Sequence, residues 1–195
     1  MANTDAAFGL KPVGNAYGGP FNGGVRRYYI PSTDTDTAVY IGSVVKLTGG
    51  ADTFGVPVVT GNVSTADPVV GVVTSVEAIT AESLQYRANS TSRYVYVADD
   101  PDCLFEVQAD DDGSTLAATA VGGTCILVGF TSGSTVTGLS AVELDSSNLS
   151  ETSDTNDDVR IIQFVQAPDN IAGETNGRWL VRLNIHQYVQ SAVGV

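Results

Sequence analysis

The stretch YVYVADDPDCLFEVQADDDG, residues 94–113, places two alternating apolar segments on either side of a short acidic turn. In both segments hydrophobic side chains recur at every second position, which is typical of half-buried strands. Pro and Asp between the segments are residues that favour turns. The pattern therefore predicts strands over 92–98 and 103–109, paired as a hairpin through the turn DDPD at 99–102.

The same stretch carries seven acidic side chains, and two interpretations compete for them. A calcium site would need the aspartates of 99–102 and of 110–112 to converge, because Ca²⁺ takes six to eight oxygen ligands. In a hairpin, however, the second group lies at the far end of its strand, about 20 Å away. The turn interpretation requires only that Pro101 fixes φ and that aspartates accept hydrogen bonds from free turn amides. The sequence favours a turn with charges facing water and no metal site, and a bound cation stays the alternative.

Elsewhere the chain repeats short runs of Val, Ile, Thr, Tyr and Phe between clusters of Gly, Asp, Asn and Ser, the signature of many short strands. In the clearest run, Trp179, Val181 and Leu183 share one face. The predicted fold class is all-β, an antiparallel β-barrel or jelly-roll-like sandwich with an extended N-terminal arm. The further predicted strands are 26–30, 37–47, 56–60, 68–79, 115–120, 124–130, 159–166 and 178–189.

We expect one domain, divided into an arm and a body. Residues 1–25 are rich in Gly, Ala, Asn and Pro with irregular apolar residues, so the arm is expected to gain order by docking into another surface. Residues 26–195 form a single β body. Within it, 145–158 reads as an acidic polar loop without periodicity.

The balance of charge excludes several partners. The 195 residues include nine Lys plus Arg against 22 Asp plus Glu, a formal net charge of −13. Such acidity argues against binding to nucleic acid or to anionic membrane surfaces. No apolar run approaches the roughly 18 residues of a membrane-spanning helix. The N-terminus also lacks the basic start and apolar core of a secretory signal.

Motifs for catalysis are not evident in the sequence. His186 is the one histidine and has no serine or cysteine in a recognisable nucleophile context. Cys103 and Cys125 are predicted to be buried thiols on strands, with a disulfide left open because spacing alone does not give their separation. A hydrolase would need two carboxylates within about 10 Å in a cleft. The prediction is a protein that is not an enzyme and uses no cofactor.

Partner contacts are instead predicted where the arm enters the body. The arm supplies apolar anchors, and the only concentrated basic and aromatic patch follows it directly; Arg and Tyr are over-represented at interface centres. The predicted partner-contact residues are Phe8, Leu10, Pro12, Tyr17, Phe21, Arg26, Arg27, Tyr28 and Tyr29.

Several sequence blocks together resemble a known family. The blocks are DAAFGLKPV, YYIPS, YVADDPDCLFEVQADD, LAATAVGG, GLSAVELDSS and RWLVRLNIHQY. In this order, and over almost the whole chain, they resemble the capsid cement or decoration proteins of tailed bacteriophages. The resemblance implies a virion protein on the outer surface of the capsid, which binds the major capsid protein at capsomer junctions, stabilises the mature head and has neither catalytic activity nor a cofactor.

The expected assembly is a homo-oligomer, a trimer rather than a dimer, made in the host cytoplasm. The alternative is a head-fibre or tail-associated β-domain that binds a receptor or carbohydrate. That function would use exposed aromatic residues such as Tyr94, Tyr96 and Tyr188.

Overall fold

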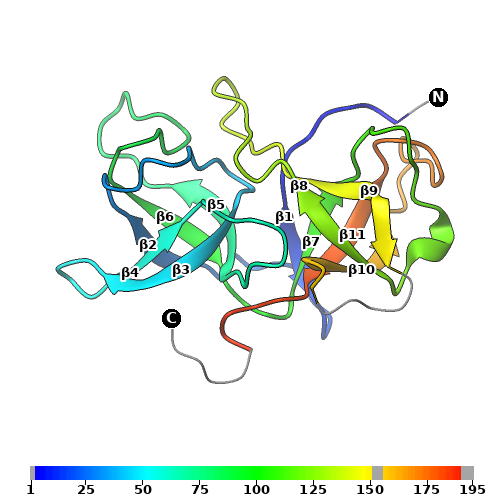
Figure 1. Cartoon of the computed structure of the whole chain (residues 1–195), viewed down its shortest axis with the longest axis horizontal. Coiled ribbons are helices and arrows are strands. Elements are labelled where there is room, and N and C mark those ends of the chain that lie inside the picture. The colour runs from blue at the N-terminus through cyan, green and yellow to red at the C-terminus, as the bar shows by residue number, and fades with distance from the viewer. Residues whose placement is uncertain (1–2, 151–155, 190–195) are drawn as a thin grey trace.

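The computed structural model describes residues 3–150 and 156–189 and is built almost entirely of strands. Two sheets lie side by side, with the N-terminal strand in the second sheet rather than the first (Figure 1). Within the described residues the helical content is one short 3₁₀ helix, η1 (Ala118–Ala120), and no helix there is long and apolar enough to cross a bilayer. The predicted all-β fold class is confirmed.

The first sheet is a closed barrel of five strands in the order β2-β4-β3-β5-β6. Neighbouring strands are antiparallel except for β2 and β4, which pair in parallel. Closure leaves no open sheet edge, and the interior is filled mainly by valines. The strands are β2 (Arg26–Ile30), β3 (Val44–Ala51), β4 (Pro57–Thr60), β5 (Gly71–Val76) and β6 (Arg93–Ala98).

The second sheet has six antiparallel strands in the order β1-β7-β11-β10-β8-β9. A bridge between Ala109 and Leu144 brings β9 against the residue that follows β7, so the sheet curls back on itself. The strands are β1 (Lys11–Asn15), β7 (Cys103–Gln108), β8 (Thr124–Val128), β9 (Glu143–Ser150), β10 (Val159–Phe164) and β11 (Arg178–Leu183).

The two strands of the opening stretch exist, but the predicted hairpin between them is wrong. β6 pairs with β2 and β5 in the barrel, whereas β7 pairs with β1 and β11 in the six-stranded sheet. Residues 99–102 therefore carry the chain from one sheet to the other. Alternation and a turn predict where strands lie but not which strands pair. Each strand pairs with the neighbours that bury its apolar face. Val97 packs in the barrel interior, whereas Phe105 packs in the core cluster of the six-stranded sheet.

The expectation of an arm is wrong for residues 3–15, which belong to the folded body. β1 pairs with β7 from Lys11 opposite Glu106 to Asn15 opposite Cys103. Leu10 is 1% exposed, because it is inserted into the larger core cluster. The N-terminal segment therefore docks on its own chain, and its longest exposed part is the loop that follows β1.

The predicted loop 145–158 is corrected as well. Its first part lies in β9, which pairs with β8. Leu144 and Ser146 point inward and are buried. The hydrophobic pattern did not predict this strand, because one of its inward residues is the serine Ser146. The Ser146 hydroxyl is hydrogen-bonded to Asp110 rather than packed against apolar groups. Residues 151–155 of the predicted loop lie outside the described residues.

Both sheets contribute residues to the larger of two hydrophobic core clusters. The larger core cluster contains Val72 and Ala98 from the barrel together with Phe105, Trp179 and Val181 from the six-stranded sheet. The prediction that alternate residues of the last strand face the core is confirmed, since Trp179 and Val181 are at most 1% exposed. A second cluster fills the barrel interior.

The chain leaves the six-stranded sheet after β1, completes the barrel, and returns at β7, the neighbour of β1. At this point the Ala16 amide donates a hydrogen bond of 2.8 Å to the Asp102 carbonyl. The outgoing and returning segments therefore lie side by side. A cleft of about 730 Å³ lies at this crossing.

Candidate functional site

The nine predicted contact residues do not form one surface. Leu10 and Tyr28 are each 1% exposed and pack within the protein, so their contact with a partner stays a prediction that the structure does not support. Their apolar atoms fill the core beneath the exposed residues. The other seven fall into three regions: an apolar cleft (Phe8, Pro12 and Phe21), the outside of the barrel (Arg27 and Tyr29) and the crossing between the sheets (Tyr17 and Arg26).

The outside of the barrel gathers the most ordered group of aromatic side chains. Arg27 lies opposite Tyr96 and Tyr29 opposite Tyr94 across the β2–β6 pair. Alternate residues of paired strands share a face, so these four side chains stand together on the outer surface. We call them, with Phe54 on the β3–β4 turn, the barrel face.

Contacts between these side chains hold the barrel face rigidly. The Arg27 guanidinium lies 3.6 Å from the centroid of the Tyr94 ring, and the Tyr29 and Tyr94 centroids are 5.1 Å apart. Arg27 also donates two hydrogen bonds, of 2.9 and 3.0 Å, to the Glu77 carboxylate. The Tyr96 hydroxyl donates to the same carboxylate. The charge of the arginine is thus neutralised within the protein while its planar face covers a ring.

Asp52 connects the barrel face to the exposed turn. Its carboxylate accepts a 2.6 Å hydrogen bond from the Tyr94 hydroxyl and 2.8 Å bonds from the amides of Phe54 and Val56. The turn is therefore fixed, although the Phe54 side chain is 84% exposed. The Tyr94 hydroxyl lowers the pKa of Asp52, and that carboxylate in turn raises the pKa of Tyr94.

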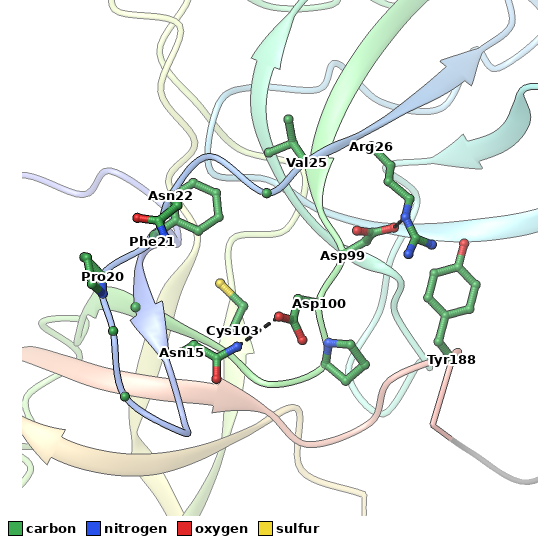
Figure 2. Close-up of a pocket in the computed structure, with 15 residues that line it drawn as sticks. Asn15, Pro20, Phe21, Asn22, Val25, Arg26, Asp99, Asp100, Cys103 and Tyr188 are labelled. Atoms are coloured by element: carbon green, nitrogen blue, oxygen red, sulfur yellow. Dashed lines mark hydrogen bonds and ion pairs between the residues drawn. The ribbon is translucent and has the colours of Figure 1, made fainter.

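The cleft at the crossing, which we call the junction cleft, has a volume of about 730 Å³. Figure 2 shows Asn15 and Asp100 at its base, Phe21 and Asn22 on one side, and Arg26, Asp99 and Tyr188 on the other. The lining residues are Gly14, Asn15, Gly18, Gly19, Pro20, Phe21, Asn22, Gly24, Val25, Arg26, Asp99, Asp100, Pro101, Cys103 and Tyr188.

Hydrogen bonds fix the wall beside Arg26. Asp99 is only 7% exposed, accepts a 2.7 Å hydrogen bond from the Tyr28 hydroxyl and lies 3.4 Å from the Arg26 guanidinium. The Tyr28 and Tyr188 hydroxyls are 2.8 Å apart. Burial raises the pKa of Tyr28 well above its ordinary value. The prediction that the acidic turn simply faces water is therefore wrong for Asp99, which is a buried acceptor.

An apolar cleft of about 510 Å³ separates β1 from the barrel. It brings together four of the nine predicted contact residues, which sequence reasoning grouped only as scattered anchors of an arm. The cleft is lined by Phe8, Leu10, Lys11, Pro12, Phe21, Ile41, Val73, Thr74, Glu106 and Leu139.

A cluster of carboxylates does exist, but it does not join the aspartates of 99–102 to those of 110–112. Among the described residues, Asp110, Asp112 and Asp145 form one group whose carboxylate oxygens lie within 4.8 Å of one another. The Ser146 hydroxyl lies 2.8 Å from Asp110 and 3.0 Å from Asp112. β9 brings Asp145 to this place, so the contribution of that strand could not be anticipated while it was read as a loop.

Both cysteines are free and buried, as predicted. Burial raises the pKa of Cys103 and of Cys125 to about 12, so neither thiol is a nucleophile at neutral pH. His186 is also buried, and its Nδ1 accepts a hydrogen bond from the Tyr188 amide. These groups supply packing and hydrogen bonds rather than reactivity.

Sequence reasoning identified Arg27 and Tyr29 but did not join them to Tyr94, Tyr96 and Phe54. The signal was present in β6, where Tyr94 and Tyr96 alternate with valines, but β2 begins with four basic or aromatic residues in a row and does not show which of them face outward. Only the pairing of β2 with β6 shows that the two polar faces coincide.

Comparison with known proteins adds no relative. No family model, no curated protein and no solved structure matches the chain. The function is therefore argued from the sequence blocks and from the geometry described above.

Proposed function

We propose that this protein is a capsid cement protein, which binds the outside of a major capsid shell at capsomer junctions and stabilises the mature head of a tailed bacteriophage. The phage assignment is supported by the family resemblance of the sequence blocks. The observation that carries a protein-binding function is the barrel face, in which three half-buried tyrosines on the outer surface are joined by an exposed arginine and an exposed phenylalanine.

The chemistry of the barrel face suits a protein partner. Tyrosine and arginine are enriched among the residues that dominate binding energy at interfaces. The Arg27, Tyr94 and Asp52 contacts already fix the rings, so little side-chain entropy is lost on binding. Phe54 supplies an apolar anchor that has no cover within the described residues of its own chain.

Charge and valency support the same proposal. A net charge of −13 keeps free subunits apart at high concentration and favours a partner surface of opposite sign. In a homo-oligomer, the trimer being the proposed form, several barrel faces would engage neighbouring capsid subunits at high effective concentration. Weak single contacts would then add up to stable decoration.

The proposal is tested by cosedimentation of the purified protein with expanded shells of the major capsid protein from the same phage. Phe54→Ala is expected to weaken binding at least about tenfold, because central aromatic anchors contribute roughly 2 kcal/mol or more. Val136→Ala is the matched control, since Val136 is 89% exposed on a loop outside the barrel face.

Two results would count against the proposal in different ways. If wild-type protein does not bind the shells, the cement function is wrong. If wild type binds and Phe54→Ala and Arg27→Ala bind equally well, the function stands but the barrel face is not the contact surface.

A further inference from the structure

The junction cleft is a second exposed feature, separate from the barrel face, and the residues lining it restrict what it can hold. Arg26 is the single cation among its lining residues, and it is already paired with Asp99. Asp100 lies exposed at the base of the cleft beside this pair. Two carboxylates against one arginine disfavour phosphates, nucleotides and other anions.

The hydrogen bonds of the carboxylates also argue against a metal ion. Asp99 is held by Tyr28 and Arg26. Asp100 accepts hydrogen bonds of 2.9 Å from the Asn15 side chain and from the Asp102 amide. Among the described residues Asp99 and Asp100 do not belong to a group of carboxylates close enough to share a cation.

Polar and aromatic groups remain available on both walls. Asn22 is exposed on the loop wall, where Gly18 and Gly19 have no side chains and adopt positive φ values of 93° and 108°. A Cβ atom at either glycine would meet nothing within 4 Å, so the wall is open to a ligand. On the other wall, the Tyr188 ring is 45% exposed, with its hydroxyl held by Tyr28.

We propose that the junction cleft binds a neutral saccharide. Planar amides and carboxylates such as Asn22 and Asp100 offer donors and acceptors for neighbouring sugar hydroxyls. The Tyr188 ring, which has the Arg26 guanidinium 5.9 Å from its centroid, offers its exposed part to the C–H groups of a sugar ring, and its hydroxyl is already hydrogen-bonded. The volume of about 730 Å³ accommodates a small oligosaccharide.

This inference separates two functions that the sequence could not distinguish. Tyr94 and Tyr96, expected to bind carbohydrate together with Tyr188, lie on the barrel face with their hydroxyls bonded to Asp52 and Glu77. Tyr188 lies in the junction cleft. Saccharide binding in the cleft would add attachment to glycans and does not depend on capsid binding.

The test is a titration of the isotope-labelled full chain, followed by NMR, with maltotriose, cellotriose and chitotriose as neutral probes. ATP and sialyllactose serve as anionic comparisons. At roughly 10 mM sugar, dissociation constants in the millimolar range are detected. We expect at least one neutral trisaccharide to shift the amide signals of Asn22, Asp100 and Tyr188, and the anions to shift them less.

Variants locate the binding. Asn22→Ala and Tyr188→Ala are expected to weaken saccharide binding about fivefold or more, corresponding to the loss of a hydrogen bond or a ring contact. Tyr188→Phe keeps the ring and is expected to retain binding. Phe54→Ala, on the barrel face, is the matched control and leaves saccharide binding unchanged.

The proposal is overturned if no neutral probe shifts the signals of the cleft, if an anionic probe binds more tightly, or if the cleft variants bind as wild type does. Loss of capsid binding in Phe54→Ala with saccharide binding intact supports two separate surfaces. Failure of capsid binding alone would leave the saccharide result unaffected, so the two proposals fail independently.

Discussion

Glu143 is a half-buried residue whose ionisation opposes folding. Its Oε1 atom is inaccessible and has no hydrogen-bond partner. Burial, together with the nearby carboxylates of Asp5 and Asp110, raises the pKa of Glu143 to about 7. The folded state therefore binds the proton of Glu143 more tightly than the unfolded chain does. Above pH 7 the side chain is charged, and the free energy of unfolding is lowered by the full cost of burying that charge. The penalty disappears as the pH falls toward the ordinary value near 4.5.

We therefore predict that Glu143→Gln raises the free energy of unfolding at pH 8 by about 1 to 2 kcal/mol. At pH 4.5 the difference should shrink to a few tenths of a kcal/mol, because Glu143 is then neutral in the folded state. Urea denaturation at the two pH values, followed by tryptophan fluorescence, measures the difference. Equal stabilisation at both pH values would mean that charge is not the cause.

Arg87 is a buried residue that no sequence pattern identified. Its side chain is 0% exposed and donates hydrogen bonds to the carbonyls of Pro31, Thr37 and Thr91, and it pairs with Asp34. An arginine in a polar segment reads as a surface residue, because charged side chains are mostly exposed. Its burial becomes favourable only in the folded protein, where the loop at 31–37 and Thr91 surround the guanidinium with carbonyl acceptors.

At the scale of elements, strands with regular alternation were predictable and strands without it were not. β11 was evident because the large apolar residues Trp179, Val181 and Leu183 recur at every second position, with arginines at two of the three positions between and before them. β1, with the sequence KPVGN, contains a proline and a glycine, both poor strand formers, and becomes a strand because β7 offers it a partner. Pairing is a property of two distant segments, so the partners of β6 and β7 could not be read from either segment alone.

The integration of β1 leads to a prediction opposite to that for a detachable arm. Deleting residues 2–15 removes an edge strand and Leu10 from the core, and it leaves β7 unpaired on one side. We expect a loss of at least about 3 kcal/mol in the free energy of unfolding, since burial of Leu10 alone is worth 2 to 5 kcal/mol. Chemical denaturation and soluble yield measure the effect.

Tyr17→Ser is the control for this deletion, because Tyr17 is 85% exposed on the loop that follows β1. Its stability should match that of the wild type. A deletion variant that unfolds at the wild-type midpoint would show that β1 contributes nothing to the fold, contrary to its pairing and burial.

At the scale of the whole molecule, the shared core couples the two sheets. Residues from both sheets meet in one hydrophobic cluster that includes Trp179, the one tryptophan of the chain. We predict a single cooperative unfolding transition in which tryptophan fluorescence and far-ultraviolet circular dichroism change together. Two separated transitions would show that the barrel unfolds independently of the six-stranded sheet.

The order of strands along the chain has a consequence for synthesis on the ribosome. β1 emerges first, but its partner β7 begins at Cys103, after the whole barrel has been translated. At roughly 5 to 20 residues per second, β1 waits several seconds for its neighbour, and the barrel has time to form in between. The nascent barrel would then bring the outgoing and returning segments together, so that β7 meets a strand already waiting beside it.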